Sequence, residues 1–260
     1  MELSGRVVVI TGGAGGIGAA MARRFAAEGA EAVIVADLDA EAAGVVADDI
    51  GTGATAAAVD VTDAGQVAAL VAQTEQRYGR IDLFCANAGV TSGVGLDGDF
   101  DRAWQVNVMG HLHAARAVLP GMLARGEGYL LQTCSAAGLL TSVGDAAYAT
   151  TKHAAVGLAE WLAVTYGDRG IRVSALCPQG VDTPMLSEGL AAGHLGARVT
   201  AAAGAVLAPE QVAQAVVEGI EAERFLILPH PQVALFHQRK AENPDGWLTA
   251  MRTMVRRFSS

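Results

Sequence analysis

Tyr148 and Lys152 stand four residues apart in the run Tyr148-Ala149-Thr150-Thr151-Lys152, and Ser135 precedes the tyrosine by 13 residues. Residues four apart in a helix lie on one face, one turn from each other. A free phenol has a pKa of about 10, so it exchanges its proton poorly at neutral pH. A neighbouring ammonium favours the phenolate and lowers that pKa. The pair is therefore suited to moving a hydroxyl proton, although a lysine stem packed beside a tyrosine is a commoner reason for the spacing.

A second group of residues is suited to binding a dinucleotide. The apolar run Arg6–Ile10 leads into Thr11-Gly12-Gly13-Ala14-Gly15-Gly16-Ile17-Gly18, and a helical pattern follows. Glycines permit a tight turn and close approach of the backbone to a pyrophosphate, and a helix N-terminus offers it unpaired N–H groups. A tight turn without a ligand is the alternative for the glycines alone.

Asp37 closes the second apolar run, nineteen residues after Gly18. A carboxylate at this place can accept hydrogen bonds from both hydroxyls of an adenosine ribose. It repels a 2′-phosphate, and no Arg or Lys stands beside it to compensate. The residue therefore favours NAD(H) over NADP(H), with a helix N-cap as the alternative reading.

These residues need a scaffold, and the hydrophobic pattern predicts one. Short apolar runs alternate with longer helical patterns, which indicates an α/β fold with a doubly wound, mostly parallel sheet covered by helices on both faces. The seven predicted strands are Arg6–Ile10, Ala32–Ala36, Thr55–Val59, Ile81–Ala86, Tyr129–Thr133, Ile171–Leu176 and Phe225–Leu228. The predicted helices are Gly16–Glu28, Ala40–Ile50, Ala64–Tyr78, Phe100–Arg125, Ala146–Tyr166 and Pro209–Glu223.

The chain has no linker or internal repeat, so we expect a single domain over residues 1–260. The Gly- and Ala-rich stretch 183–207 is predicted to be a mobile lid over the substrate. Residues 229–260 form a helical extension, broken at Asn243-Pro244-Asp245-Gly246. We expect it to cover the active site of its own chain or to contact another subunit.

Composition excludes several functions. The formal net charge is −9, which disfavours nucleic acid and anionic membranes as partners. No signal peptide and no membrane span is evident, so we expect a cytoplasmic protein. Three cysteines without metal spacing, Cys85, Cys134 and Cys177, are interpreted as free buried thiols. His111 and His113 do not share a helix face, so no metal site is expected.

Taken together and in this order, the motifs resemble the short-chain dehydrogenase/reductase family, in its shorter single-domain branch. The resemblance covers about residues 5–230 and implies a Rossmann fold. The matching positions are Thr11-Gly12-x-x-x-Gly16-x-Gly18, Asp60-Val61, Asn87-Ala88-Gly89, Asn107, Ser135, Tyr148, Lys152, and Pro178 followed by Val181-Asp182-Thr183-Pro184.

The resemblance implies hydride transfer between a substrate carbinol carbon and nicotinamide, with Tyr148 as general base in oxidation and general acid in reduction. It implies that Lys152 lowers the pKa of the phenol and binds the nicotinamide ribose, and that Ser135 forms a hydrogen bond with the substrate oxygen. It further implies that Asn107 holds a water behind the lysine and that Thr183 binds the nicotinamide carboxamide. The residues expected to bind NAD are Gly12, Gly16, Ile17, Gly18, Asp37, Leu38, Asp60, Val61, Asn87, Ala88, Gly89, Tyr148, Lys152, Pro178, Val181 and Thr183.

The chain departs from the family at Gln179, where Pro-Gly is usual and this sequence reads Pro178-Gln179-Gly180. The amide either donates to the substrate or points to solvent while Gly180 takes over the turn. The pocket is expected to be built from 136–145, Gln179 and 185–207 and to be mainly apolar. These stretches contain no Arg or Lys before Arg198, which favours a lipophilic secondary alcohol or ketone such as a steroid, an alicyclic alcohol or an aryl carbinol. The residues expected to contact substrate are Ser135, Leu140, Val143, Tyr148, Gln179 and Met185.

Two other activities remain open. One is reduction of a 3-oxoacyl thioester, which the missing Arg-Asp-Asn run after Asn87-Ala88-Gly89 disfavours; the other is a non-catalytic NAD-binding regulator, which the intact Ser135, Tyr148 and Lys152 disfavour. The resemblance also implies a homotetramer, or a homodimer, built on the long helices about 100–125 and 146–167. Small residues there should permit close packing, namely Ala114, Ala115, Ala154, Ala155 and Gly157.

Overall fold

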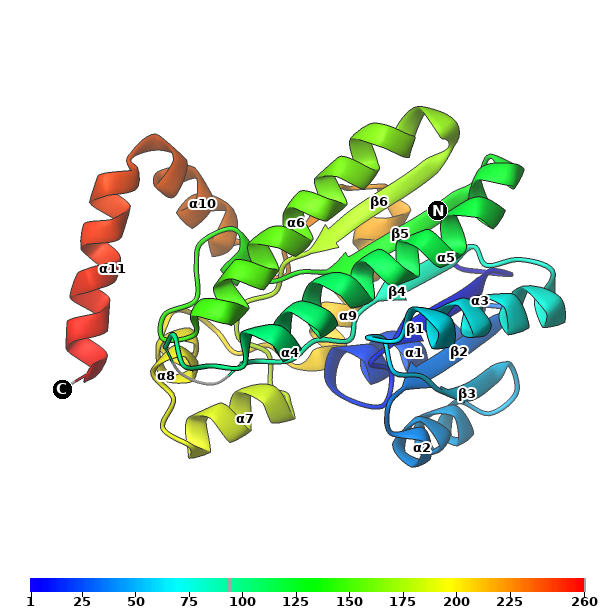
Figure 1. The fold of residues 1–260 in the computed structure, drawn as a ribbon, viewed down its shortest axis with the longest axis horizontal. Helices are drawn as coiled ribbons and strands as arrows, with labels where there is room; N and C mark the ends of the chain where they lie inside the picture. Colours follow the sequence, from blue (N-terminus) through cyan, green and yellow to red (C-terminus); the bar gives the residue numbers. More distant parts are fainter. Residues whose placement is uncertain (93–94, 260) are drawn as a thin grey trace.

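Seven strands form one sheet in the order β3-β2-β1-β4-β5-β6-β7, and every neighbouring pair is parallel. The structure is a computed structural model and describes residues 1–92 and 95–259 (Figure 1). The predicted doubly wound parallel sheet is confirmed. The strands are β1 Val7–Thr11, β2 Ala32–Asp37, β3 Ala54–Ala58, β4 Leu83–Ala86, β5 Gly128–Thr133, β6 Ile171–Leu176 and β7 Leu226–Ile227.

Helices alternate with the strands along the chain. The bounds of α2, α3, α6 and β6 are those predicted from the sequence. The helices are α1 Gly16–Ala27, α2 Ala40–Ile50, α3 Ala64–Tyr78, α4 Phe100–Trp104, α5 Gly110–Arg125, α6 Ala146–Tyr166, α7 Pro184–Ala191, α8 Leu195–Ala202, α9 Pro209–Glu221, α10 Gln232–Glu242 and α11 Pro244–Ser259. The pattern predicted as one helix over 100–125 contains a wider π-helical turn, Gln105–Met109, between α4 and α5.

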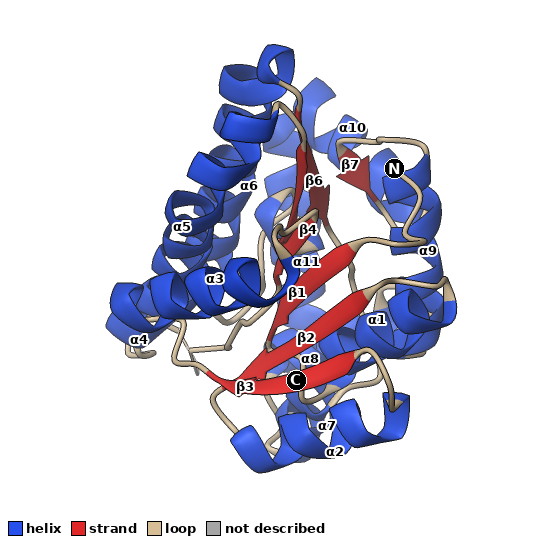
Figure 2. Ribbon diagram, turned by 90° about the vertical axis from the view of Figure 1, so that its right-hand side faces the viewer, coloured by secondary structure: helices blue, strands red, loops and turns tan. Residues whose placement is uncertain are grey.

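Two apolar cores lie on opposite faces of the sheet, since successive side chains of a strand point to opposite sides. From β1, Val7 and Val9 pack with residues of α3, α5 and α6. Val8 and Ile10 pack with residues of α1, α2 and α9 on the other face. Figure 2 shows α3, α5 and α6 on one side of the strands and α1 and α9 on the other. This double burial explains why the central strands are apolar throughout.

Strands β1 and β4 are neighbours at the centre of the sheet. From β1 the chain adds β2 and β3 on one side, and from β4 it adds β5, β6 and β7 on the other, so the strand order changes direction between β1 and β4. In open parallel sheets, ligands bind at the carboxyl ends of the strands beside such a switch point. The glycine-rich loop after β1 and the residues after β4 therefore lie where a dinucleotide binds in this architecture.

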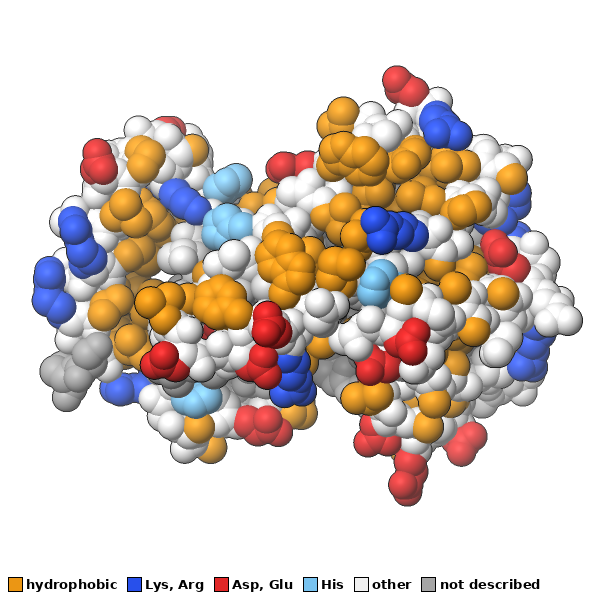
Figure 3. Space-filling view, in the orientation of Figure 1, with side chains coloured by type: hydrophobic (Ala, Val, Ile, Leu, Met, Phe, Trp, Pro, Cys, Tyr) orange, Lys and Arg blue, Asp and Glu red, His pale blue; other side chains and the backbone are white. Residues whose placement is uncertain are grey.

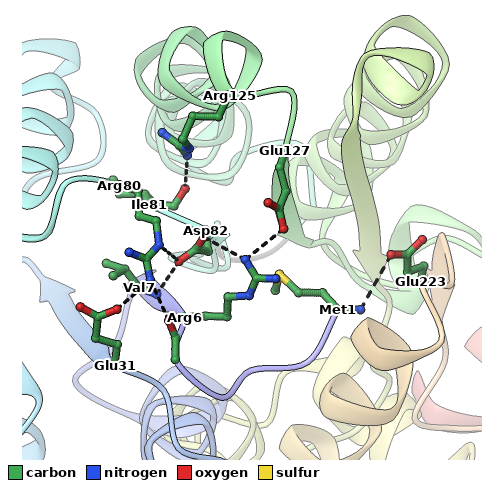
Figure 4. A network of polar contacts seen from close by, with 11 residues as sticks. Met1, Arg6, Val7, Glu31, Arg80, Ile81, Asp82, Arg125, Glu127 and Glu223 are labelled. Carbon is green, nitrogen blue, oxygen red and sulfur yellow. Dashed lines mark hydrogen bonds and ion pairs between the residues drawn. The ribbon is translucent and has the colours of Figure 1, made fainter.

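The amino ends of the central strands are held together by ion pairs around Asp82, which is 6% exposed (Figure 4). Its carboxylate accepts from Val7 N–H at 2.8 Å and pairs with Arg80 at 2.9 Å and Arg6 at 3.2 Å. The contacts tie the start of β1 to the start of β4. They fix the two central strands whose other ends carry the site.

The expectation that small residues of the two long helices serve contact between subunits is wrong for three of the five residues, whereas Ala154 is half-buried and Gly157 is exposed on α6. Ala114, Ala115 and Ala155 are 1%, 1% and 0% exposed because they face their own sheet, so they are not available for contact between subunits. The outer surface of α6 instead presents Trp161 and Val164, which are 56% and 86% exposed. Apolar side chains gather over α5 and α6 on the face seen in Figure 3.

The segment 183–207, in which no helix was predicted, contains α7 and α8. The extension forms two helices, as predicted, but the break between them is confined to Asn243 because α11 begins at Pro244. Lys240 Nζ of α10 donates to Leu139 O at 2.7 Å, so this helix packs on a loop of its own chain. Helix α11 packs against α8 and α10. In Figure 1 these two helices stand at the end of the molecule nearest α8.

Candidate active site

The glycine-rich loop has no room for side chains at two positions. A Cβ on Gly18 would lie 2.0 Å from Gly12 O, and one on Gly12, where φ is +63°, would lie 2.8 Å from the backbone of Ala88. The loop ends at Gly15, which caps α1 without a side-chain hydrogen bond. The first N–H groups of α1 are thus presented above a narrow glycine cradle, a suitable arrangement for a pyrophosphate.

The Asn87-Ala88-Gly89 run holds this loop from the end of β4. Asn87 Nδ2 donates to Thr11 O at 3.0 Å and to Gly12 O at 3.1 Å, and Asn87 N donates to Thr11 Oγ1 at 3.0 Å. Ala88 N also reaches Thr11 Oγ1, at 3.3 Å. Asn87 therefore builds the cradle by bonding to its carbonyls.

Asp37 lies at the end of β2 and faces the glycine loop. Its Oδ2 accepts from Ala14 N at 3.0 Å, and its Oδ1 accepts from Asp39 N at 3.1 Å. The N-cap of α2 is Asp39, whose carboxylate accepts from Ala42 N. The alternative of Asp37 as a helix cap is thereby wrong, and its half-buried carboxylate stays beside the loop. The next residue, Leu38, is 74% exposed.

Asp60 and Val61 lie in the turn between β3 and α3. The Asp60 carboxylate accepts from both the N–H and the hydroxyl of Thr62, at 2.9 and 2.8 Å. Val61 O accepts from His113 Nδ1 at 3.1 Å, which ties this turn to α5. Ile17, in the first turn of α1, is half-buried against the core of that face.

Ser135 and Tyr148 meet at the carboxyl end of β5. Ser135 is 8% exposed and caps the short 3-10 turn Ala136–Gly138, with its Oγ accepting from Ala137 N at 3.0 Å. The Ser135 hydroxyl lies close enough to the Tyr148 phenol to lower the pKa of that phenol. The two hydroxyls, thirteen residues apart in sequence, are therefore adjacent in the fold.

Lys152 lies one turn beyond Tyr148 and is 2% exposed. Its Nζ donates to Thr133 O at 2.9 Å and lies 5.7 Å from the centre of the Tyr148 ring. Burial lowers the pKa of the Lys152 ammonium, and the neighbouring Cys134 and Cys177 oppose that shift. A Cβ on Gly89 would lie 3.3 Å from this Nζ, so the glycine leaves the space in front of the ammonium open.

The expected lowering of the phenol pKa is not what this structure shows. Burial raises the pKa of Tyr148 above its ordinary value of 10, and the neighbouring Ser135 hydroxyl opposes this only in part. Removing a phenolate from water costs free energy, and the Lys152 ammonium is bonded to Thr133 O. In the chain alone the phenol is therefore protonated at neutral pH.

Asn107 is fully buried in the π-helical turn. Its Oδ1 accepts from Val90 N at 2.9 Å, and its Nδ2 donates to Val90 O at 2.9 Å and to Thr151 Oγ1 at 3.0 Å. The side chain thus fastens the segment after Gly89 to α6. Widened π turns often mark functional sites, and this one directs Asn107 inward.

The turn after β6 brings the last cofactor residues to the loop. Pro178 O accepts from Ala136 N at 2.8 Å, directly beside Ser135. Val181 is 5% exposed and pairs with Leu207. Thr183 lies against the glycine loop, since a Cβ on Gly16 would be 3.1 Å from its methyl group. Of the predicted cofactor residues, Asp37 after β2, Asn87 after β4 and Thr183 after β6 therefore meet at the glycine loop that follows β1.

The expected substrate residues are spread over three segments. Leu140 is 7% exposed and lies in the loop between β5 and α6, where Val143 is half-buried. In that loop Thr141 has a φ of 129°, a strained conformation for a β-branched residue. Met185, in the first turn of α7, is 41% exposed. Gln179 is half-buried, and its Oε1 accepts from Gln232 Nε2 at 3.1 Å, so its amide is not directed freely to solvent.

Two buried residues of the site region were missed by the sequence reasoning. Asp145, 8% exposed, accepts from Tyr148 N at 2.9 Å and from Ser92 N at 3.0 Å, so it caps α6 and fixes its first turn. An Asp three residues before Tyr148 is a recognisable cap signal. His230, 1% exposed, bonds to the turn after β6, and nothing in its local sequence indicates burial.

The cysteines and His111 lie in the buried core rather than in a metal site. Cys85, Cys134 and Cys177 are free and buried, as predicted. His111 Nδ1 is 2.6 Å from Gln132 Oε1, and burial together with the Lys152 charge lowers the pKa of this histidine to about 3. Within the described ranges, no three His, Cys, Asp or Glu side chains gather in a way that could hold a metal ion. No helix among the described residues is long and apolar enough to cross a membrane.

Comparisons with known proteins agree with this geometry. The family described as short chain dehydrogenase matches residues 6–192. Oxidoreductase UcpA of Escherichia coli (strain K12) is 40% identical over 191 residues, which cover 71% of this chain and 72% of that protein. The 1-deoxy-11-beta-hydroxypentalenate dehydrogenase of Streptomyces exfoliatus is 37% identical over 237 residues, covering 87% and 84%.

A solved structure is similar over almost the whole chain. The short chain dehydrogenase/reductase from Burkholderia phymatum, in complex with NAD, has a TM-score of 0.85 and 30% identity, over 94% of this chain and 96% of that one. The family match covers more than half of the chain and includes the glycine loop, Ser135, Tyr148 and Lys152. The chain belongs to the short-chain dehydrogenase/reductase family of oxidoreductases.

Proposed function

We propose that the chain is an NAD(H)-dependent dehydrogenase that interconverts a lipophilic secondary alcohol and its ketone. The observation that carries the proposal is the proximity of the Tyr148 and Ser135 hydroxyls, with Lys152 buried one turn away and its Nζ beside Gly89. A hydroxyl pair beside a buried ammonium suits the transfer of a carbinol proton.

The residues present fit NAD(H). The glycine cradle and the free N-terminus of α1 suit a pyrophosphate, and the Asp37 carboxylate suits an unphosphorylated ribose. The related structure from Burkholderia phymatum holds NAD, which supports the same choice here. When bound, the nicotinamide accepts or supplies the hydride.

The chain's own groups handle the proton and the oxygen. Tyr148 takes the carbinol proton in oxidation and returns it in reduction, while Ser135 donates a hydrogen bond to the substrate oxygen and stabilises its developing charge. Lys152 stabilises the phenolate and binds the nicotinamide ribose. Asn107 holds α6 and the segment after Gly89 in register, and a water behind Lys152 completes the path to solvent.

The substrate class follows from the pocket walls. Leu140, Val143 and Met185 are apolar, and the stretches 136–145 and 185–197 around them contain no Arg or Lys. The 37% identical Streptomyces relative is named as a dehydrogenase of a hydroxypentalenate, which supports an alicyclic carbinol. A steroid or an aryl carbinol fits the same walls.

The test is a panel of secondary alcohols with NAD⁺, followed by the absorbance of the reduced nicotinamide. It should include steroid, alicyclic and aryl carbinols, and a 3-oxoacyl thioester with NADH in the reverse direction. Turnover of one or more carbinols supports the proposal. Turnover of the thioester alone would favour the reductase, and NADH binding without turnover of any compound would favour a regulator.

The cofactor preference is tested with Asp37→Ala. Loss of the carboxylate should weaken NADH binding about 10-fold or more and narrow the difference from NADPH, because a charged hydrogen-bond acceptor is lost and a repulsion is removed. Asp39→Ala is the matched control, since it removes the cap of α2 two residues away. An unchanged NADH preference in Asp37→Ala would contradict the assignment.

A further inference from the structure

His230 is a buried polar residue whose ring contacts the active-site turn. It lies in the sequence Pro229-His230-Pro231, between β7 and α10, and is 1% exposed. A buried imidazole must use its ring nitrogens in hydrogen bonds, because an unpaired one costs free energy. Both of its partners belong to the backbone that follows β6.

The two ring nitrogens have opposite roles. Nδ1 accepts from Gln179 N at 3.1 Å, and Nε2 donates to Gly180 O at 3.0 Å. This pairing assigns the neutral tautomer with its proton on Nε2. Burial lowers the pKa of His230, with the carbonyls of Gly180 and Ala205 opposing, so the ring keeps this form at neutral pH.

The ring thereby joins segments that surround the substrate. Pro178 O accepts from Ala136 N at 2.8 Å, next to Ser135. Gly180 O also accepts from Leu207 N at 3.0 Å, and Leu207 O accepts from Asp182 N at 2.8 Å. Hydrogen bonds therefore join the turn after β6 to the Ser135 loop and to the end of the segment 183–207. His230 bonds to the turn itself, at Gln179 N and Gly180 O.

The same turn carries the side chain of Gln179, the residue that departs from the family pattern. Gln232, two residues after His230, donates from Nε2 to Gln179 Oε1 at 3.1 Å. Gly204 adjoins this pair, since a Cβ there would lie 2.4 Å from Gln232 Nε2. This bond fixes the direction of the Gln179 side-chain amide.

We propose that His230 is a positioning residue for the nicotinamide and substrate side of the site. It sets the backbone of the Pro178–Val181 turn through two hydrogen bonds and, with Gln232, the direction of the Gln179 amide. The glycine loop and Asp37, which hold the adenosine side, make no contact with it. The inference rests on the proposed function only for its kinetic readout.

The test uses three substitutions that remove the two hydrogen bonds in different ways. His230→Phe keeps the ring and removes both bonds. His230→Asn keeps an amide near the Nδ1 position, and His230→Gln keeps one near the Nε2 position. Val233→Ala is the matched control, because Val233 is fully buried in the first turn of α10 and makes no side-chain hydrogen bond.

Binding is measured with NADH and with ADP-ribose, which lacks the nicotinamide. His230→Phe should weaken NADH about 10-fold, because two buried backbone groups lose their partners, and leave ADP-ribose within about 2-fold. His230→Asn and His230→Gln should each recover part of the loss. For a carbinol that the enzyme oxidises, kcat/KM should fall about 10-fold to 100-fold in His230→Phe.

Hydrogen exchange of the cofactor-free chain gives a readout that needs no turnover. His230→Phe should speed exchange in residues 178–182 and 203–207, and Val233→Ala should not. Equal NADH-to-ADP-ribose ratios and unchanged exchange in all three His230 variants would overturn the proposal, as would the same pattern in Val233→Ala. A wild-type chain that binds NADH but oxidises no carbinol defeats the proposed function alone, and the exchange data still decide the role of His230.

Discussion

At the scale of single residues, the site depends on a phenol that needs help to lose its proton. Burial raises the pKa of Tyr148, and Lys152 is itself buried with a lowered pKa and bonded to Thr133 O. The spacing of Tyr148 and Lys152 was sufficient to predict their proximity on one helix, and the family resemblance added Ser135 from the end of the preceding strand. Their proton affinities depend on burial by the whole fold and were not predictable.

The first prediction concerns this titration. In the cofactor-free chain the tyrosinate absorbance that is lost in Tyr148→Phe should develop only above pH about 10, because the folded state disfavours the phenolate. NAD⁺ adds a positive charge and should move the titration to lower pH. The phenol is then protonated below pH 10 in both folded and unfolded chains, so its contribution to folding stability is constant there and is lost gradually above it. A Tyr148 phenolate at pH 7 without cofactor would contradict this.

At the scale of elements, the cofactor cradle is made by glycines that have no space for a side chain. Gly18 is the most restricted, because its Cβ would lie 2.0 Å from Gly12 O and 2.7 Å from Asn87 Nδ2. The loop and α1 were predictable from the spacing of glycines after an apolar strand. The contacts of Asn87 with Thr11 and Gly12 were not, since they join segments 75 residues apart.

The second prediction is that Gly18→Ala weakens NADH binding about 10-fold or more and lowers the free energy of unfolding by about 1–3 kcal/mol, since the loop must move to admit the methyl group. Gly44→Ala is the control, because a Cβ at Gly44 in α2 meets nothing within 4 Å. The control should bind NADH normally and be as stable as the wild type or more so. Normal binding in Gly18→Ala would show that the cradle tolerates a side chain.

At the scale of the molecule, contacts that stabilise the fold lie at the amino ends of the central strands, and the residues of the candidate site lie at the carboxyl ends. Asp82 and its arginines fasten the amino ends of β1 and β4, whereas the carboxyl ends of the strands carry the glycine loop, Asn87 and Ser135. The doubly wound parallel sheet was predictable from alternating apolar and helical patterns with right-handed crossovers. The packing of α10 on Leu139 was not, because it depends on one lysine and a distant carbonyl.

The third prediction is that a substitution at the amino ends of the strands changes stability but not cofactor binding. Asp82→Ala should lower the free energy of unfolding by about 2–3 kcal/mol, because two arginines and the Val7 N–H lose their acceptor, while NADH affinity stays unchanged. Asp49→Ala, which removes the exposed partner of Arg23, should cost less than about 1 kcal/mol. Denaturant unfolding and NADH titration check both. A loss of NADH binding in folded Asp82→Ala would show that the contacts at the amino ends of the strands also affect the cofactor site.

A fourth prediction concerns assembly, which we expect to use the outer face of α6. Trp161→Glu should lower the molecular mass in solution if subunits meet there, because a buried charge opposes association. Val45→Glu, on the exposed face of α2, is the control and should leave the mass unchanged. An unchanged mass of an oligomer in Trp161→Glu would place the interface elsewhere.

The most direct test of the account is Tyr148→Phe, compared with the wild type for NADH binding and for oxidation of a secondary alcohol. The substitution removes one hydroxyl and keeps the ring, so NADH affinity should remain within about 3-fold while kcat falls by at least about 100-fold. This result would place the proton transfer on Tyr148. Unchanged turnover with normal NADH binding would contradict the assignment of that residue and the mechanism built on it.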